Sequence, residues 1–199
     1  GRNSGCYFTN CYYTEGSGTD NSGENKGNGA PAMVTDAALA SGELAYSLGD
    51  AFYQTLGTDA YPTTDFTKPS VYQLAVTDAG YATFAPTVNV AALPAGVEAY
   101  AAQVNKNAEG QVYLAPVDQV PADNAVVVKA AEGSYYYNNA ATAAAIEEND
   151  LTYSDDVVTA DGTQYILART DEKGVGFYKA NGDIAPRKAF LVSASGVKA

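Results

Sequence analysis

The chain has 199 residues, of which 46% are hydrophobic, and its 23 acidic and 11 basic side chains give a formal net charge of -12. This length and composition suffice for one ordinary packed domain, with room for a small appendage. The negative charge repels phosphate backbones, so we expect no nucleic-acid partner. No run of about 18 apolar residues occurs, so we expect no membrane insertion. Because the chain begins with Gly1, we interpret it as a fragment or a processed product.

The chain contains no histidine. This absence excludes Ser-His-Asp and Cys-His nucleophiles, an imidazole general base and any zinc site with a histidine ligand. Carboxylate pairs, tyrosine, lysine and oxygen-ligated metals remain as means of catalysis. The sequence shows no signature of a glycosidase carboxylate pair. We predict a noncatalytic protein, and an enzyme with a carboxylate site is the third interpretation, because a sequence does not show clefts.

Residues 1–30 are rich in glycine, asparagine, serine and threonine, which is typical of loops and linkers. Cys6 and Cys11 stand five positions apart in this stretch. In an oxidising compartment they can form a disulfide, whose entropic gain is small because the loop is short. A pair of free, buried thiols is the favoured alternative. Two thiols without further ligands do not make a structural zinc site.

Residues 31–67 have the pattern of a linker that contains a short helix. Thr35 or Asp36 can cap a helix of about two turns, which breaks near Ser41 because Gly42 interrupts the pattern. A second short turn is predicted over residues 43–48.

Residues 68–199 predict an all-β fold, a β-sandwich of about nine short strands. Apolar runs recur about every 8 to 12 residues with turn-forming residues between them, as in sandwiches and barrels. The predicted strands are 71–76, 81–85, 97–104, 111–117, 125–130, 134–139, 164–169, 176–180 and 188–193. The turns NKNAEG and TDEKG each predict a hairpin, one between the third and fourth of these strands and one between the seventh and eighth. Residues 142–149 allow either a helical turn or a loop of small residues.

Acidic residues cluster between residues 147 and 161. Calcium takes six to eight oxygen ligands from such flexible loops, and Asp155, Asp156 and Asp161 are the candidate ligands. The spacing of an EF-hand loop is missing, and a solvated acidic loop is the favoured interpretation. We therefore predict no cofactor other than this candidate calcium ion.

Three tyrosines, Tyr135, Tyr136 and Tyr137, follow one another in a predicted strand. Alternation places Tyr135 and Tyr137 on one face and Tyr136 on the other. One face is expected to be core, and the other can form a stacking platform for sugar rings or for a protein partner. Tyrosines on a half-buried sheet surface are the favoured alternative.

The segment SGELAYSLGDAFYQTLGTDAYPT at residues 41–63 resembles a junction in large secreted or surface-anchored proteins of Bacteroides and Prevotella type gut and oral bacteria. In those proteins it closes a glycine-rich, GLUG-like repeat region, and a β-rich C-terminal module follows. Four further motifs of that module stand here in the same order: AGYATFA at 79, LPAGVEAY at 93, VPADNAVVVKA at 120 and VGFYKA at 175. The third motif departs from the pattern because it lacks the glycine usually found before the valines.

The resemblance implies a domain organisation and a cellular location. Residues 1–30 resemble the last rung of the repeats, which implies the end of a parallel β-solenoid before the linker and the sandwich. It implies an extracellular or cell-surface location and a noncatalytic role in adhesion, attachment or structural scaffolding. The expected partner is a host or bacterial surface protein or a glycan. A carbohydrate-binding accessory module is the alternative.

Overall fold

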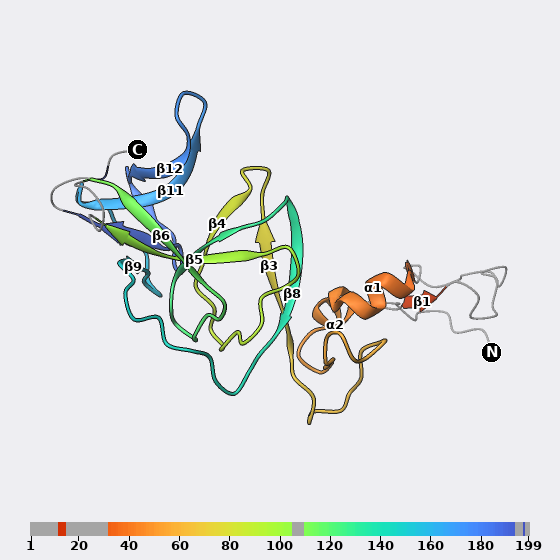
Figure 1. Ribbon diagram of the computed structural model, residues 1–199. Coiled ribbons are helices and arrows are strands. Elements are labelled where there is room, and N and C mark those ends of the chain that lie inside the picture. The colour runs from red at the N-terminus through yellow and green to blue at the C-terminus, as the bar shows by residue number, and fades with distance from the viewer. Residues whose placement is uncertain (1–11, 15–31, 105–109, 194–196, 198–199) are drawn as a thin grey trace, which may run out of the picture. The chain divides into compact units, whose positions relative to one another are not determined.

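The computed structural model describes residues 12–14, 32–104, 110–193 and 197 (Figure 1). The chain divides into two units, residues 1–72 and residues 73–199. Residues 1–30, from which a solenoid rung was predicted, lie outside the described residues except for Tyr12–Thr14. The rung and the state of Cys6 and Cys11 therefore stay predictions.

Within its described residues, the first unit has two short strands and two short helices. β1 (Tyr12–Thr14) and β2 (Ala32–Val34) pair in parallel. α1 (Asp36–Ser41) and α2 (Glu43–Leu48) follow β2 directly. The predicted linker helix with its break is thereby confirmed.

Local chemistry fixes the ends of these helices. The Thr35 hydroxyl oxygen accepts a 3.2 Å hydrogen bond from the Ala38 N–H, as a helix N-cap does. Gly42 has a φ of 91°, a left-handed conformation that ends α1 and that other residues rarely adopt. Two six-residue helices therefore replace one longer helix.

The second unit is an all-β sandwich of antiparallel sheets. Sheet A has the strand order β4-β7-β5-β6, and sheet B has the order β12-β11-β14-β9. Two-stranded pairs β3-β8 and β10-β13 accompany them. The strand bounds are β3 (Val71–Val76), β4 (Tyr81–Phe84), β5 (Glu98–Val104), β6 (Val112–Val117), β7 (Val126–Lys129), β8 (Gly133–Asn138), β9 (Leu151–Thr152), β10 (Val158–Thr159), β11 (Gln164–Thr170), β12 (Gly174–Lys179), β13 (Asp183–Ile184) and β14 (Phe190–Val192).

All nine predicted strands occur within two residues of their expected bounds, as β3 to β8, β11, β12 and β14. The hairpins β5-β6 and β11-β12 are confirmed as antiparallel pairs. Residues 142–149 form no helix, so the alternative of a loop is the correct one there. The two-residue strands β9, β10 and β13 were not predicted, because two residues show no period.

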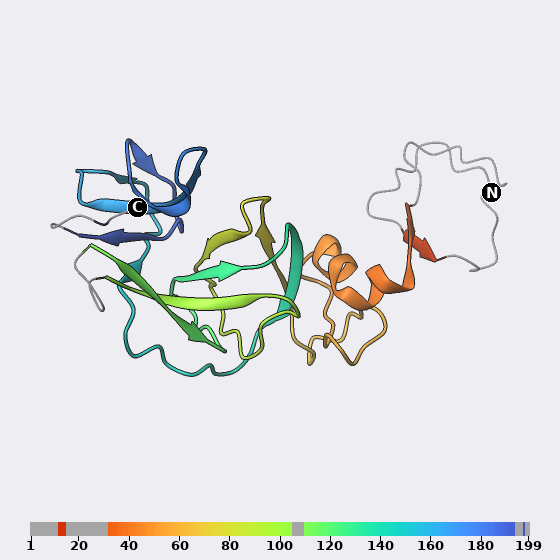
Figure 2. The same ribbon diagram turned by 45° about the horizontal axis from the view of Figure 1, so that its top comes forward.

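The main core lies between sheets A and B. Ala102 and Val127 of sheet A pack with Tyr165, Phe177 and Leu191 of sheet B, and all five are buried. Figure 2 shows the two layers, with the green strands of sheet A beneath the blue strands of sheet B. Burial of such aliphatic and aromatic side chains is the main stabilising contribution to the unit.

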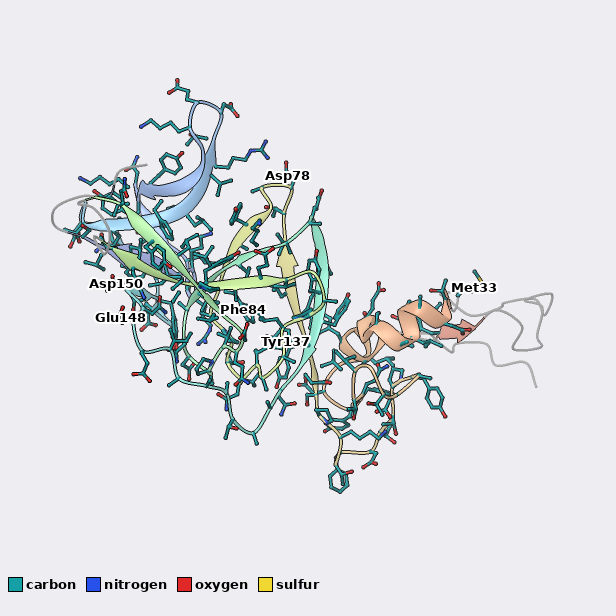
Figure 3. The ribbon with its side chains drawn as sticks, in the orientation of Figure 1. Met33, Asp78, Phe84, Tyr137, Glu148 and Asp150 are labelled. Carbon is teal, nitrogen blue, oxygen red and sulfur yellow. The ribbon has the colours of Figure 1, made fainter. Side chains whose placement is uncertain are left out.

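The second face of sheet A is covered by β8. Phe84 and Val126 are cross-strand partners on the face opposite Val127. There the Phe84 ring meets the Tyr137 ring edge to face, with centroids 5.5 Å apart and an interplanar angle of 84° (Figure 3). At β7, sheet A is therefore buried on both faces, which explains the run of three fully buried valines at 126–128.

Candidate functional site

A cavity opens between the inner faces of sheets A and B. Its volume is about 320 Å³, within the range of ligand pockets. Val112 and Leu114 line it from β6, and Val175 and Phe177 line it from β12. Leu167 of β11 also lines it, as do three further side chains: Tyr81 of β4, Val127 of β7 and Val197.

A second depression, of about 550 Å³, adjoins the cavity. The two share Tyr81, Leu167 and Val175, and we call them together the groove. Four charged residues line the second depression, which we call the rim of the groove: Asp78, Arg169, Asp171 and Lys188. Arg169 Nη1 and Asp78 Oδ2 form an exposed ion pair at 3.4 Å. The groove therefore combines an apolar floor with a charged rim.

The strand β6 borders the groove with a free outer edge among the described strands. The Ala102 N–H donates to Asn149 Oδ1 at 3.0 Å and its carbonyl accepts from the Asp150 N–H at 2.7 Å, so the Ala102 backbone faces away from β6. In an antiparallel ladder its partner Leu114 must then face away from β5. By the same alternation Val112 also directs its backbone N–H and carbonyl outward.

The strand β12 has the corresponding position in sheet B. The Ala180 N–H donates to the Gln164 carbonyl at 2.9 Å, which makes these two residues a bonded pair. Alternation along β12 then turns the backbone groups of Phe177 and Val175 outward. Two strand edges thus flank the groove.

Arg187 joins loops of both sheets at another place on the unit. Its guanidinium donates to the Ala85 carbonyl at 3.1 Å, to Asp123 Oδ1 at 3.0 Å and to Asp155 Oδ1 at 2.6 Å. It also lies over the Tyr153 ring, 4.5 Å from the centroid. We call Arg187, Asp123, Tyr153 and Asp155 the Arg187 clamp.

The clamp holds two backbones in a rare conformation and shifts two pKa values. Of the described non-glycine residues, only Asp123 and Arg187 have positive φ angles, 60° and 59°. The hydrogen bond from Arg187 lowers the pKa of Asp123. Burial, followed by the hydrogen bond to Asp123, raises the pKa of Tyr153. The charged form of Asp123 and the neutral form of Tyr153 are therefore the ones that the clamp favours, and both forms preserve its hydrogen bonds.

Two of the three candidate calcium ligands, Asp155 and Asp161, have carboxylates that accept hydrogen bonds within the protein, whereas Asp156 forms one through its backbone N–H. Asp155 binds Arg187, and Asp161 Oδ1 accepts from the Thr163 N–H and hydroxyl at 2.9 and 2.7 Å. The Asp156 N–H donates to the Ser154 hydroxyl at 3.0 Å. Within the described ranges, no three acidic or cysteine side chains gather in a way that could hold a metal ion. The calcium site stays a prediction without support from this geometry.

Asn149 and Asp150 of the acidic segment bind the edge of β5 beyond Tyr100, where its pairing with β7 ends. Asn149 Oδ1 accepts from the Ala102 N–H at 3.0 Å, and Asn149 Nδ2 donates to the Ala125 carbonyl at 2.7 Å. Asp150 Oδ2 accepts from the Val104 N–H at 2.7 Å. Figure 3 labels Glu148 and Asp150 on this side of the unit. These polar side chains replace a missing strand partner.

The three candidate tyrosines do not form one row. Tyr137 is buried against Phe84, so it is not available to a ligand. Tyr135 is half-buried, and its hydroxyl donates to the Ala131 carbonyl at 3.0 Å. Tyr136 is half-buried on the other face, where Gln73 Nε2 donates to Ser134 Oγ at 3.0 Å and lies 3.4 Å from the Tyr136 hydroxyl. Tyr135 and Tyr136 thus stay candidate sugar contacts on opposite faces of β8, and Tyr136 has a polar amide and hydroxyl close by.

Carboxyl groups in the described residues show pKa shifts in one direction. The pKa values of five of them are lowered, in each case chiefly by a hydrogen bond that a neighbour donates: Asp59 from Lys68, Asp65 from Thr67, Glu98 from Tyr100, Asp123 from Arg187 and Asp161 from Thr163. A general acid at neutral pH needs a raised pKa. These five carboxyls are therefore unsuited to that role.

No protein-family model, curated protein or solved structure matches the chain. In the part of the chain that the structure describes, no helix is long and apolar enough to cross a membrane.

The groove was not found by sequence reasoning. Its lining comes from five strands, and no local pattern shows which strands stand at an edge. The two predicted hairpins were the one signal in the sequence that could have indicated the edge strands. The second strand of a hairpin lies at the edge of its sheet unless a further strand pairs with it. Both β6 and β12 are such strands.

Proposed function

We propose that the chain is a noncatalytic module of a bacterial cell-surface or secreted protein, and that its sandwich serves attachment through the groove. The observation that carries this proposal is an apolar cavity of about 320 Å³ that is open between two packed sheets. A sandwich core is normally filled by its own side chains. An open apolar lining with a charged rim has the character of a binding site.

The chemistry of the groove favours binding over catalysis. Its acidic lining consists of Asp78 and Asp171, and Asp78 is engaged by Arg169. The apolar lining between the sheets and the mixed charges beside it suit recognition of a partner.

The location belongs to the same proposal. The junction segment at residues 41–63 and the four motifs after it resemble those of surface and secreted proteins of gut and oral bacteria. Attachment to a host or bacterial surface protein or glycan is the role that such a location favours.

Retention of the labelled chain on immobilised mucin, plant polysaccharides and matrix proteins tests the proposal, with cleavage products assayed in parallel. We expect saturable retention without cleavage. Val175→Asp, which places a charge in the apolar groove, should weaken retention about tenfold or more. Val157→Asp is the matched control, because Val157 is an exposed valine away from the groove.

Two results would contradict the proposal. Release of sugar or peptide fragments would show catalysis. Retention that Val175→Asp leaves unchanged, or no retention on any surface, would remove attachment through the groove and leave a scaffold role.

A carbohydrate-binding accessory module is the second candidate function. It is favoured by the polar group around Tyr136, where the Gln73 amide and the Ser134 hydroxyl lie beside the ring. Aromatic rings with adjacent amides and hydroxyls suit sugars. On a glycan array, Tyr136→Ala should then abolish binding, while Tyr113→Ala, at an exposed tyrosine of β6, should not. Equal binding by both variants would exclude this site.

A further inference from the structure

We propose that the groove receives an extended peptide segment of another protein, which adds to the free edge of β6 as an antiparallel strand. This inference rests on the proposed function, because it names the partner of the same groove. It commits to a peptide backbone as the group that is recognised.

The backbone of β6 supplies the first argument. Val112 and Leu114 direct their N–H and carbonyl groups away from β5, and no described strand pairs with them. Pro116, in the same alternation, offers a carbonyl only. An extended peptide at the ordinary strand spacing of about 4.8 Å can satisfy these groups, as in other cases of strand addition.

The side chains of the same residues supply the second argument. Val112 and Leu114 line the groove, together with Leu167 and Phe177 across the cavity. In an antiparallel pair, directly opposite residues place their side chains on the same face. Every second side chain of the added strand would therefore enter the apolar groove, and apolar residues should occupy those positions.

The choice of β6 over β12 follows from their sequences. Natural proteins protect free edges with charged residues, glycine-containing irregularities or proline. The strand β12 carries Lys179 at an outward position and glycine at 174 and 176. The strand β6, VYLAPV, has no charged residue, and its Pro116 blocks one end only. Among the described strands, the Val112 and Leu114 edge is thus left open for pairing.

The negative net charge of the chain favours one kind of partner. Residues 73–199 contain 15 acidic and eight basic residues, and the whole chain has a net charge of -12. A second copy of this chain would bring a further large negative charge to the interface, whereas a strand with basic flanks is attracted. The rim of the groove is balanced, with two acidic and two basic residues. The net charge of the unit therefore favours a foreign strand with alternating apolar residues and basic ends.

A synthetic peptide tests this directly. In the probe, valine alternates with threonine between terminal lysines, and fluorescence anisotropy measures its binding to the whole chain. If valines enter the groove, the valine amides face β6 and the threonine amides face outward. N-methylation of the valine amides should then weaken binding about tenfold or more, and N-methylation of the threonine amides should leave it nearly unchanged.

Variants of the protein provide a second, independent comparison. Val112→Pro and Val112→Ala both shorten the side chain in the groove, but only the proline removes the outward N–H. The N–H is not used by β5, so both variants should fold, which thermal unfolding checks. Binding of the probe should be about fivefold weaker or more in the proline variant than in the alanine variant.

Several results would overturn the inference. The first is that the probe does not bind, and the second is that the two methylated peptides bind equally weakly. The third is that only methylation of the threonine amides weakens binding, which contradicts the antiparallel arrangement.

The oligomeric state gives a further test. If the chain forms a dimer in sedimentation and Val112→Pro disrupts it, the strand at the edge of β6 belongs to a second copy of the chain. If surfaces retain the chain but the probe does not bind, attachment stands and strand addition fails. If the probe binds but no surface retains the chain, attachment is the part that fails.

Discussion

Arg187 shows how one side chain can hold a polar loop region together. Its guanidinium reaches loops after β4, β6 and β9, so three separate segments depend on it. Its partners Asp123 and Asp155 are largely exposed, with side-chain exposures of 61% and 72%, so the ion pairs alone contribute little. The bonds to backbone carbonyls and the stacking on Tyr153 carry most of the effect.

Replacement of Arg187 by alanine should lower the free energy of unfolding by about 1–3 kcal/mol, because it leaves the Ala85 carbonyl without its donor. Urea unfolding measures this difference. Arg169→Ala is the control, since its ion pair with Asp78 is exposed, and its effect should stay within about 0.5 kcal/mol. Equal effects of the two variants would contradict the role given to Arg187.

Asp59 gives the first unit a dependence on pH. The hydrogen bond from Lys68, at 2.5 Å, and then that from the Thr55 N–H, at 2.7 Å, lower the pKa of Asp59. A lowered pKa in the folded state adds stability above the unfolded-state value of about 3.9, and this stability is lost as the pH falls through the folded-state pKa.

Asp59→Asn should therefore flatten the decline in melting temperature below about pH 4. Lys68→Met should remove much of the same decline, since the Lys68 bond is the largest cause of the pKa shift. Melting curves recorded from neutral pH to about pH 2 measure the effect. Parallel declines in the wild type and in Asp59→Asn would show that this carboxyl does not contribute.

At the scale of elements, the segment before β9 acts as a substitute strand for β5. The β7 pairing ends at Tyr100, and Asn149 and Asp150 then satisfy Ala102 and Val104. Charge patterning predicted a solvated loop or a calcium site in this stretch. The backbone groups that these side chains bind are about 45 residues away in the chain, so no local pattern indicates them.

Asn149→Ala should lower the free energy of unfolding by about 2–3 kcal/mol, because it leaves the buried Ala102 N–H and Ala125 carbonyl unpaired. Asn149→Asp keeps the oxygen that accepts from the Ala102 N–H but loses the Nδ2 donor to the Ala125 carbonyl. It should therefore lower the free energy of unfolding less than Asn149→Ala does. Glu147→Ala, at an exposed position, is the control and should change little. A loss in Glu147→Ala as large as in Asn149→Ala would contradict the substitute-strand interpretation.

The strands themselves were predictable because alternation and turn residues are local signals. The break between α1 and α2 followed from Gly42 alone. The tyrosines show the limit of this reasoning. Alternation separated Tyr136 from Tyr137 correctly, but only the packing of β8 on Phe84 shows that Tyr137 belongs to the core. Which strands stand at a sheet edge is likewise a property of the assembled sheets.

At the scale of the whole molecule, the chain consists of two units, and the sandwich unit carries the groove. Its two sheets share one core but leave an apolar opening flanked by the edges of β6 and β12. The attachment role and the strand-addition proposal both depend on these edges being free in the unbound protein.

Amide hydrogen exchange followed by NMR tests that condition most directly. If the edge of β6 is free, the amides of Val112 and Leu114 should exchange about tenfold or more faster than those of Tyr113 and Ala115, which face β5. Uniform slow exchange along β6 would show that another part of the chain covers this edge, and it would contradict the account of the groove as an open binding site.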